Sequence, residues 1–137
     1  MRRAGTIAAA LLFFAAVIPA AAQSVSAPSY QGEPAVGVGI ICNTPEQAER
    51  FIALRAQGTA APQALDTVNG EVNDPRACGV AAVAFLRDQT LKTRPMGDRL
   101  VQIVRINVVA GFNGSGWHRA SAVTVQYAVV DAEGQSI

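Results

Sequence analysis

Residues 35–42, AVGVGIIC, show a clear alternation of apolar positions. Valine and isoleucine occupy every second position, and Gly37 and Gly39 lie between them. A period of two predicts a β-strand. The glycines leave one face of this strand without side chains, which favours close packing of a neighbouring element over access of a ligand to the backbone.

The next segment is predicted to be a helix that begins at Pro45. Thr44 is a suitable N-cap, and Gln47 completes a capping box three residues later. Gly58 follows as a helix terminator. The apolar side chains recur at helical spacing and form one narrow face, which comprises Ala48, Phe51, Ile52 and Ala56.

A second, shorter helix is predicted over residues 62–69, with Leu65 and Val68 on its inner side. An Asn-Gly pair is expected to end this helix. The segment that follows lacks an apolar period and is predicted to be an irregular loop that leads to Cys78.

The second half of the chain is predicted to be β-structure. Residues 79–86, GVAAVAFL, predict a buried strand, residues 87–89 a turn, and residues 90–94 a short strand. A second turn is predicted at residues 95–98, where proline and glycine occur together.

Residues 99–111 and 121–131 predict the two longest strands. Both are dense in valine, and the link between them contains the short, glycine-rich sequence FNGSGWHR, which is typical of an antiparallel hairpin. The complete order is β-α-α-β-β-β-β. We therefore expect an α+β fold, with an antiparallel sheet of about five strands and one longer and one short helix packed on one of its faces.

The N-terminus has the three-part layout of a secretory signal peptide. Two arginines precede an uncharged apolar run, and small residues then offer a cleavage site after Ala22. The apolar run is about half as long as a membrane-spanning helix, which disfavours an anchor. We expect Sec-type export to the periplasm or the cell exterior, with residues 1–22 as signal peptide, 23–34 as flexible leader and 35–137 as one domain.

The charge of the processed chain argues against nucleic-acid binding. Cleavage removes two of the eleven basic residues, which leaves nine basic side chains against ten acidic ones. A nearly neutral domain has no basic excess to neutralise phosphates. The expected kind of partner is a protein or a cell-envelope component, and no membrane span is expected after cleavage.

Cys42 and Cys78 are the only cysteines, and an even number in an exported chain predicts a disulfide. They lie far apart in the sequence, unlike the close pair of a redox motif. A thiol nucleophile with His118 as its base and an intermolecular disulfide stay open as alternatives. A structural zinc site needs four ligands, and one histidine would add only a third to the two cysteines. No metal or cofactor is therefore expected.

Unusual side chains gather in one segment, AGFNGSGWHRA. Phe112, Trp117, His118 and Arg119 lie there together, and an aromatic residue with an arginine makes a good interaction anchor. In the alternative, Trp117 folds back over the core and the glycines only form the turn. These four residues are the candidate interaction loop of a non-enzymatic binding domain.

A small secreted hydrolase is the alternative function. Asp66, Glu71 and Asp74 cluster around the second predicted helix, and His118 offers a titratable base. Paired carboxylates act in glycoside hydrolysis only when a cleft holds them at a defined distance. The chain contains no Gly-x-Ser-x-Gly, HExxH or P-loop motif, so an enzyme has less support than a binding protein.

Three segments, CNTPEQAERFIAL, VNGEVNDPRACGVAAVAFL and VQYAVV, carry a resemblance that extends over about two thirds of the chain. The chain resembles small exported two-cysteine proteins of unknown function from Gram-negative bacteria. This resemblance implies export and an α+β domain, and it implies no activity.

Residues 107–111, NVVAG, carry a second resemblance. They are similar to the Gln-Val-Val-Ala-Gly hairpin motif of cystatins, which inhibit cysteine proteases. Asn107 replaces the glutamine, and too few strands follow to form the second inhibitory hairpin. The resemblance implies a protease-inhibitor-like protein as a third possible function.

Overall fold

The computed structural model describes residues 32–132, and within them the order of elements is β-α-α-β-β-β. The predicted α+β class and the antiparallel sheet are confirmed. The predicted signal peptide and residues 23–31 of the predicted leader lie outside the described residues. The elements are β1 (Ala35–Cys42), α1 (Pro45–Ala56), α2 (Ala61–Glu71), β2 (Cys78–Met96), β3 (Arg99–Phe112) and β4 (Trp117–Asp131).

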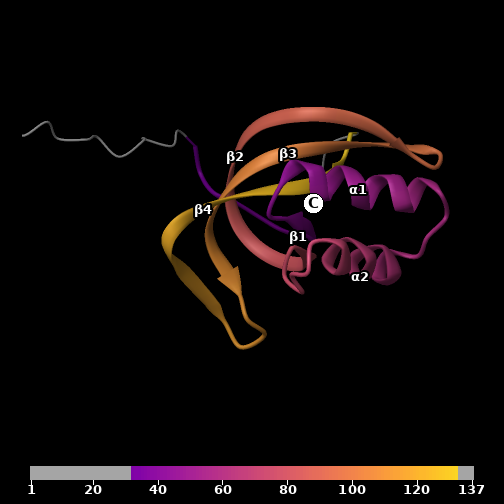
Figure 1. Ribbon diagram of the computed structural model, residues 1–137. Helices are drawn as coiled ribbons and strands as arrows, with labels where there is room; N and C mark the ends of the chain where they lie inside the picture. Colours follow the sequence, from indigo (N-terminus) through magenta and orange to yellow (C-terminus); the bar gives the residue numbers. More distant parts are fainter. Residues whose placement is uncertain (1–31, 133–137) are drawn as a thin grey trace, which may run out of the picture.

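The four strands pair in the order β1-β2-β3-β4, and β1 also pairs with β4, which closes the sheet. The closing contact is short, because only Ile40–Cys42 of β1 meets β4, at Tyr127–Val129. In contrast, β1 pairs with β2 along its whole length. In Figure 1 the sheet arches around α1, α2 lies beside α1, and the β3–β4 hairpin extends away from both helices.

The described sheet has four strands, so the prediction of about five was wrong. The expected turn at residues 87–89 is a β-bulge, and β2 continues through it for 19 residues. Asp88, the extra residue of this bulge, lies 3.1 Å from Nε of Arg105 on β3. A second bulge frees Leu91 from the ladder, and its side chain packs against the core. Bulges bend a strand without ending it, which lets β2 follow the curved sheet.

The predicted turn at residues 95–98 is confirmed in a shorter form. The ladder between β2 and β3 includes Met96 and Arg99, so only Gly97 and Asp98 form the turn. Gly97 has a φ of +65°, a conformation that glycine adopts without the steric penalty of a side chain.

The start of α1 is as the sequence predicts. The side chain of Thr44 accepts the backbone N–H of Gln47 at 3.3 Å, and the side chain of Gln47 accepts the backbone N–H of Thr44 at 3.1 Å. This reciprocal pair satisfies two N–H groups at the start of the helix. The predicted apolar face is correct except at its end, where Leu54 is buried and Ala56 is exposed.

The sheet buries apolar side chains on both of its faces. One face packs against the helices, and its cluster joins Phe51 and Ile52 of α1 with Val101 and Ile103 of β3. On the other face, side chains from all four strands pack against one another. Strands that are covered on both faces have nearly continuous apolar sequences, which accounts for the density of valine and isoleucine in β3. The second cluster comprises Ile41, Val83, Phe85, Val104, Ile106, Val108, Ala128 and Val130.

Cys42 and Cys78 form the predicted disulfide. They lie directly opposite each other in the β1–β2 ladder, with their Cα atoms 4.1 Å apart. Both residues are buried in the cluster that faces the helices. The bond therefore joins the end of β1 to the start of β2 inside the core, and neither cysteine is a free thiol.

One side chain fastens the end of α2 to the start of β2. Asn69 Oδ1 accepts the N–H of Cys78 at 2.8 Å, and Asn69 Nδ2 donates to the carbonyl groups of Cys78 and Pro75 at 3.0 and 3.1 Å. The helix itself continues to Glu71, so the predicted end at the Asn-Gly pair was placed too early. Asn69 instead anchors the loop that leads into β2.

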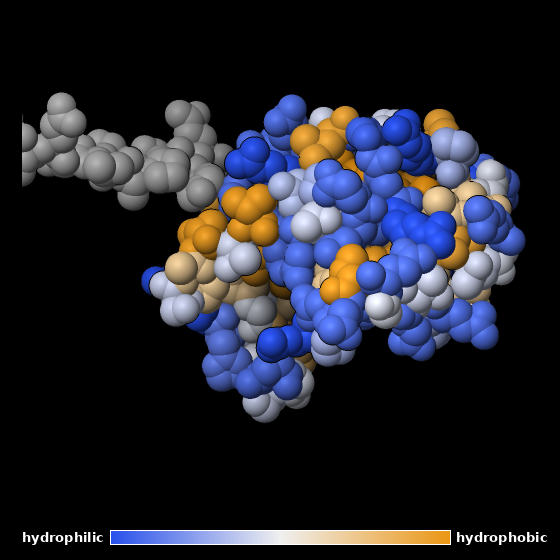
Figure 2. Space-filling view, in the orientation of Figure 1, coloured by the Kyte–Doolittle hydropathy of each residue, from blue (hydrophilic) through white to orange (hydrophobic). Residues whose placement is uncertain are grey.

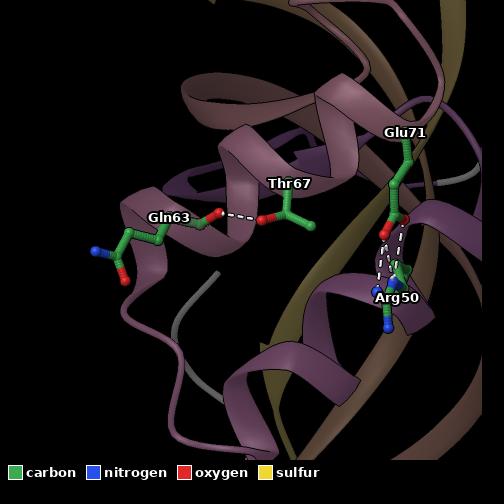
Figure 3. A network of polar contacts seen from close by, with 4 residues as sticks. All are labelled: Arg50, Gln63, Thr67 and Glu71. Atoms are coloured by element: carbon green, nitrogen blue, oxygen red, sulfur yellow. Dashed lines mark hydrogen bonds and ion pairs between the residues drawn. The ribbon is translucent and has the colours of Figure 1, made fainter.

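An ion pair joins the two helices on their exposed side (Figure 3). Arg50 of α1 donates from Nε and Nη2 to the carboxylate of Glu71 on α2, at distances of 2.8 to 3.1 Å. Hydrogen bonding to the guanidinium lowers the pKa of Glu71 below its ordinary value and raises the pKa of Arg50. Within α2, the hydroxyl of Thr67 donates to the carbonyl of Gln63 at 2.8 Å.

Replacing both Cys42 and Cys78 with alanine should lower the free energy of unfolding by about 4 kcal/mol, because the bond restricts the unfolded chain. Urea denaturation of the oxidised wild-type protein and of the double variant measures the difference. The chemically reduced wild-type protein serves as the control and should unfold like the double variant. A loss of less than about 1 kcal/mol would contradict a stabilising bond.

Asn69→Ala should destabilise the fold by about 1–3 kcal/mol, because it removes the side-chain partner of the N–H and C=O groups of Cys78, a buried residue. Gln63→Ala on the same helix is the matched control, since the Gln63 side chain points away from the other residues drawn in Figure 3. Urea denaturation should show a clear loss for the first variant and almost none for the second. Equal stability of the two variants would show that Asn69 does not anchor the junction.

Candidate functional site

The candidate site lies on the hairpin formed by β3 and β4. We call its distal part, residues 109–124, the β3–β4 arm. At the tip, Ala110, Gly111 and Phe112 of β3 pair with Arg119, His118 and Trp117 of β4. Figure 1 shows the arm extending beyond the part of the sheet that holds the helices. All four predicted interaction residues therefore lie on this hairpin, and Ala110 and Gly111 of β3 also pair with Ala84 and Val83 of β2.

The tip of the arm is held by its own hydrogen bonds. Asn113 Oδ1 accepts the backbone N–H groups of Ser115 and Gly116 at 3.0 and 3.2 Å, and it also accepts the Ser115 hydroxyl at 2.8 Å. The backbone N–H of Asn113 donates to the carbonyl of Gly116 at 3.2 Å. Gly114 has a φ of +93°, which a glycine supplies at no steric cost. The turn thus needs no contact with the core to hold its shape.

Phe112 and Trp117 form a cross-strand aromatic pair at the end of the arm. Their ring centroids are 5.6 Å apart, and the ring planes are tilted by 55°, within the range in which aromatic rings attract each other. Phe112 is 45% exposed and Trp117 is 48% exposed. Neither ring belongs to a core cluster, so Trp117 does not cover the core and the alternative role for it was wrong.

Arg119 and His118 lie on opposite faces of the arm. Side chains alternate between the two faces of a strand, and Arg119 is two residues from Trp117 while His118 is next to it. Arg119 therefore shares the face of the aromatic pair, and His118 points to the other face. Both side chains are exposed. The structure brings together Phe112, Trp117 and Arg119, and it separates His118 from them.

The direction of the arm depends on an irregularity that the sequence pattern did not reveal. Val108 pairs with Thr124, but Ala110 pairs with Arg119, so β4 contains extra residues between these two points. Extra residues in one strand bend the ladder and change where its side chains point. The extra residues make β4 bulge between these points, while Ala110 and Gly111 of β3 stay paired with β2.

The charged residues between Asp98 and Asp131 are all basic. They are Arg99, Arg105 and Arg119, and Arg105 faces the carboxylate of Asp88. Arg119 is therefore the charged residue of the β3–β4 arm itself. The arm offers a partner two aromatic rings and one positive charge.

A small apolar cleft lies elsewhere, between α1 and the sheet. Its volume is about 220 Å³, below the roughly 300–1,000 Å³ of a usual ligand pocket. Arg99 and Asp131, whose charged atoms are 3.5 Å apart, stand beside it. Its apolar lining includes Ile40, Phe51, Val80, Met96, Val101 and Val129.

The acidic residues of the alternative hydrolase do not form a catalytic group with His118. Asp66 and Asp74 line a shallow hollow beside α2, while Glu71 is held by Arg50. His118 lies on the β3–β4 arm, which extends away from α2 in Figure 1. Within residues 32–132, no three histidine, cysteine or acidic side chains converge as metal ligands would.

The cystatin-like segment does not form a hairpin turn in this fold. Residues 107–111 lie within β3, and they are followed by Phe112 before the strand ends. The turn is formed instead by the residues between Phe112 and Trp117. The geometry therefore gives no inhibitory loop to the segment that carries the resemblance.

The sequence pattern missed a second exposed apolar surface, on β1 and β2. Val36 is 66% exposed, Val38 60% and Val80 65%. In the space-filling view (Figure 2), apolar residues gather at the left, around the start of β1, while the surface over the helices is mostly hydrophilic. Alternation predicted the strand correctly but could not show that the helices leave this part of the sheet uncovered.

No protein-family model, curated protein or solved structure shows significant similarity to the chain. Among residues 32–132, neither helix is long and apolar enough to cross a membrane.

Trp117 is the only tryptophan, so its fluorescence reports on the arm alone. We expect its emission to resemble that of tryptophan in water and to be quenched readily by acrylamide. Phe112→Ala should increase the quenching further, because the neighbouring ring shields one side of the indole. Val72→Ala, at an exposed position after α2, is the control and should change nothing. A blue-shifted, poorly quenched emission would contradict the exposed geometry.

Proposed function

We propose that the chain is an exported, non-enzymatic binding domain that engages a protein of the cell envelope through the β3–β4 arm. The observation that carries this proposal is the exposed pair of Phe112 and Trp117, with Arg119 on the same face of a projecting hairpin. Both rings are about half exposed and lie beside a turn that is held by its own hydrogen bonds.

The energetics of protein interfaces favour this arm as a contact site. Tryptophan and arginine are enriched among the residues that contribute most to binding. Phe112 and Trp117 are already paired and the turn is fixed by Asn113, so association orders few additional side chains. Preorganisation of this kind lowers the entropic cost of binding.

The charge of the arm limits the chemistry of the partner. Arg119 is exposed and no residue of the arm is acidic. An aromatic pair beside an exposed guanidinium suits a protein surface that offers an apolar pocket next to a carboxylate. We infer that the partner contributes both groups.

Two features support a location outside the cytoplasm. The N-terminal sequence has the layout of a signal peptide, and the domain contains a disulfide within its core. Structural disulfides persist in oxidising compartments. The proposal therefore includes both export of the chain and a protein partner in the cell envelope.

Photo-crosslinking in intact cells tests the proposal. A photoreactive phenylalanine analogue at position 112 should give a discrete adduct with one protein, and Arg119→Ala in the same chain should reduce its yield severalfold. The matched control carries the analogue at Val72, which is also exposed but lies after α2. His118→Ala is a second control, because His118 points to the opposite face of the arm.

The outcome separates binding through the arm from other modes of action. Adducts at position 112 that disappear with Arg119→Ala support the proposal. Equal labelling from positions 112 and 72, or no adduct from position 112, would refute it. Circular dichroism of each variant shows that a lost adduct does not reflect a lost fold.

A further inference from the structure

The outer edge of β1 is open along its first half. β1 pairs with β2 from Ala35 to Cys42, but β4 reaches only Ile40–Cys42 on the other side. Among residues 32–132, no strand pairs with the outer edge of residues 35–39. This edge is formed by a different part of the molecule from the β3–β4 arm.

The hydrogen-bonding groups at this edge can be assigned from the register. The backbone N–H of Asn43 donates to the carbonyl of Ala77 at 2.8 Å, so residue 43 points toward β2. Successive residues of a strand point their backbone groups to alternate sides. Gly37 and Gly39 therefore also bond to β2, whereas the N–H and C=O groups of Val36 and Val38 point to the open edge.

The edge lacks the usual protection against pairing with another strand. Natural edge strands carry charged residues, prolines or bulges that prevent association. Residues 35–42 contain no charged residue and no proline, and the β1–β2 register runs without a bulge. Val36 and Val38 are in addition among the most exposed apolar side chains of residues 32–132. The strand has the properties of an interface rather than of a solvent-facing edge.

We propose that this edge pairs with β1 of a second copy of the chain, antiparallel and about a two-fold axis at Gly37. In this arrangement both copies present the same segment, as the isologous interface of a two-fold dimer requires, and the axis at Gly37 pairs Val36-Gly37-Val38 with itself. Val36 of each copy then lies opposite Val38 of the other, and their outward N–H and C=O groups bond to each other. Gly37 places no side chain at the axis, where the two strands approach most closely.

Charge also favours a second copy as the occupant. A strand without charged residues offers no electrostatic feature with which to select a different protein. The domain that carries it is nearly neutral, so two copies do not repel each other strongly. β4 already pairs with β1 from Ile40 onward. The contact between two copies is therefore limited to residues 35–39 and does not extend into a longer sheet.

Sedimentation velocity over a wide range of concentration tests the dimer, with the full chain purified as the cell processes it. The wild-type protein should show a reversible monomer–dimer equilibrium. Val38→Pro removes an outward N–H without removing a bond to β2, and it should raise the dissociation constant roughly tenfold or more. Val38→Thr keeps the N–H and the branched shape, and as the matched control it should dimerise nearly as well as the wild type.

Hydrogen exchange in the wild-type protein tests the same dimer without a substitution, and it does not depend on whether Val38→Pro folds. In the wild-type protein, exchange at the amides of Val36 and Val38 should slow as the concentration rises, while Gly37 and Gly39 stay protected throughout by β2. A monomer at all concentrations with fast exchange at Val36 and Val38 would overturn the proposal. A monomer in which these two amides are protected would also overturn it, because another part of the same chain or a different protein would then occupy the edge.

Discussion

The closure of the sheet at the end of β1 is the contact on which the rest of the structure depends. Within Ile40–Cys42 the strand pairs with β2 on one side and with β4 on the other, and Cys42 is covalently joined to Cys78. This junction fixes the first described strand to the last one and places the disulfide in the same core cluster as the buried side chains of α1. The capped start of α1 at Thr44 follows at once, so the direction of the helix is set by the same junction.

The shortness of this closure explains both surfaces proposed for interaction. Because β1 and β4 meet over only three residues, they diverge on either side of the contact. On one side the first half of β1 keeps an open edge, and on the other β4 continues with β3 into the projecting arm. A longer closing contact toward the start of β1 would have placed Asp131 of β4 opposite Val38 and covered this edge. Two separate surfaces are therefore consequences of one limited contact.

The elements whose signals are local were predicted well. The first helix depends on Thr44, Pro45 and Gln47, which satisfy the helix start without help from the rest of the chain. The prediction failed at residues 87–89, where polar residues indicated a turn. There the long β3, which is rich in valine and isoleucine, keeps β2 in the sheet, and the polar residues are accommodated as a bulge with Asp88 beside Arg105. A partner strand decided this outcome, and no local pattern contains that information.

The sequence by itself determined the residue types of the candidate site, the one intramolecular disulfide that is possible and the periodicity that distinguishes helix from strand. It also placed Phe112, Trp117, His118 and Arg119 in one glycine-rich hairpin. Only the tertiary structure decided that the aromatic pair faces solvent with Arg119, that His118 lies on the other face, and that the valines of β1 are uncovered. The physical reason is that exposure depends on which faces and edges of the sheet other elements reach, and these contacts join residues far apart in the chain.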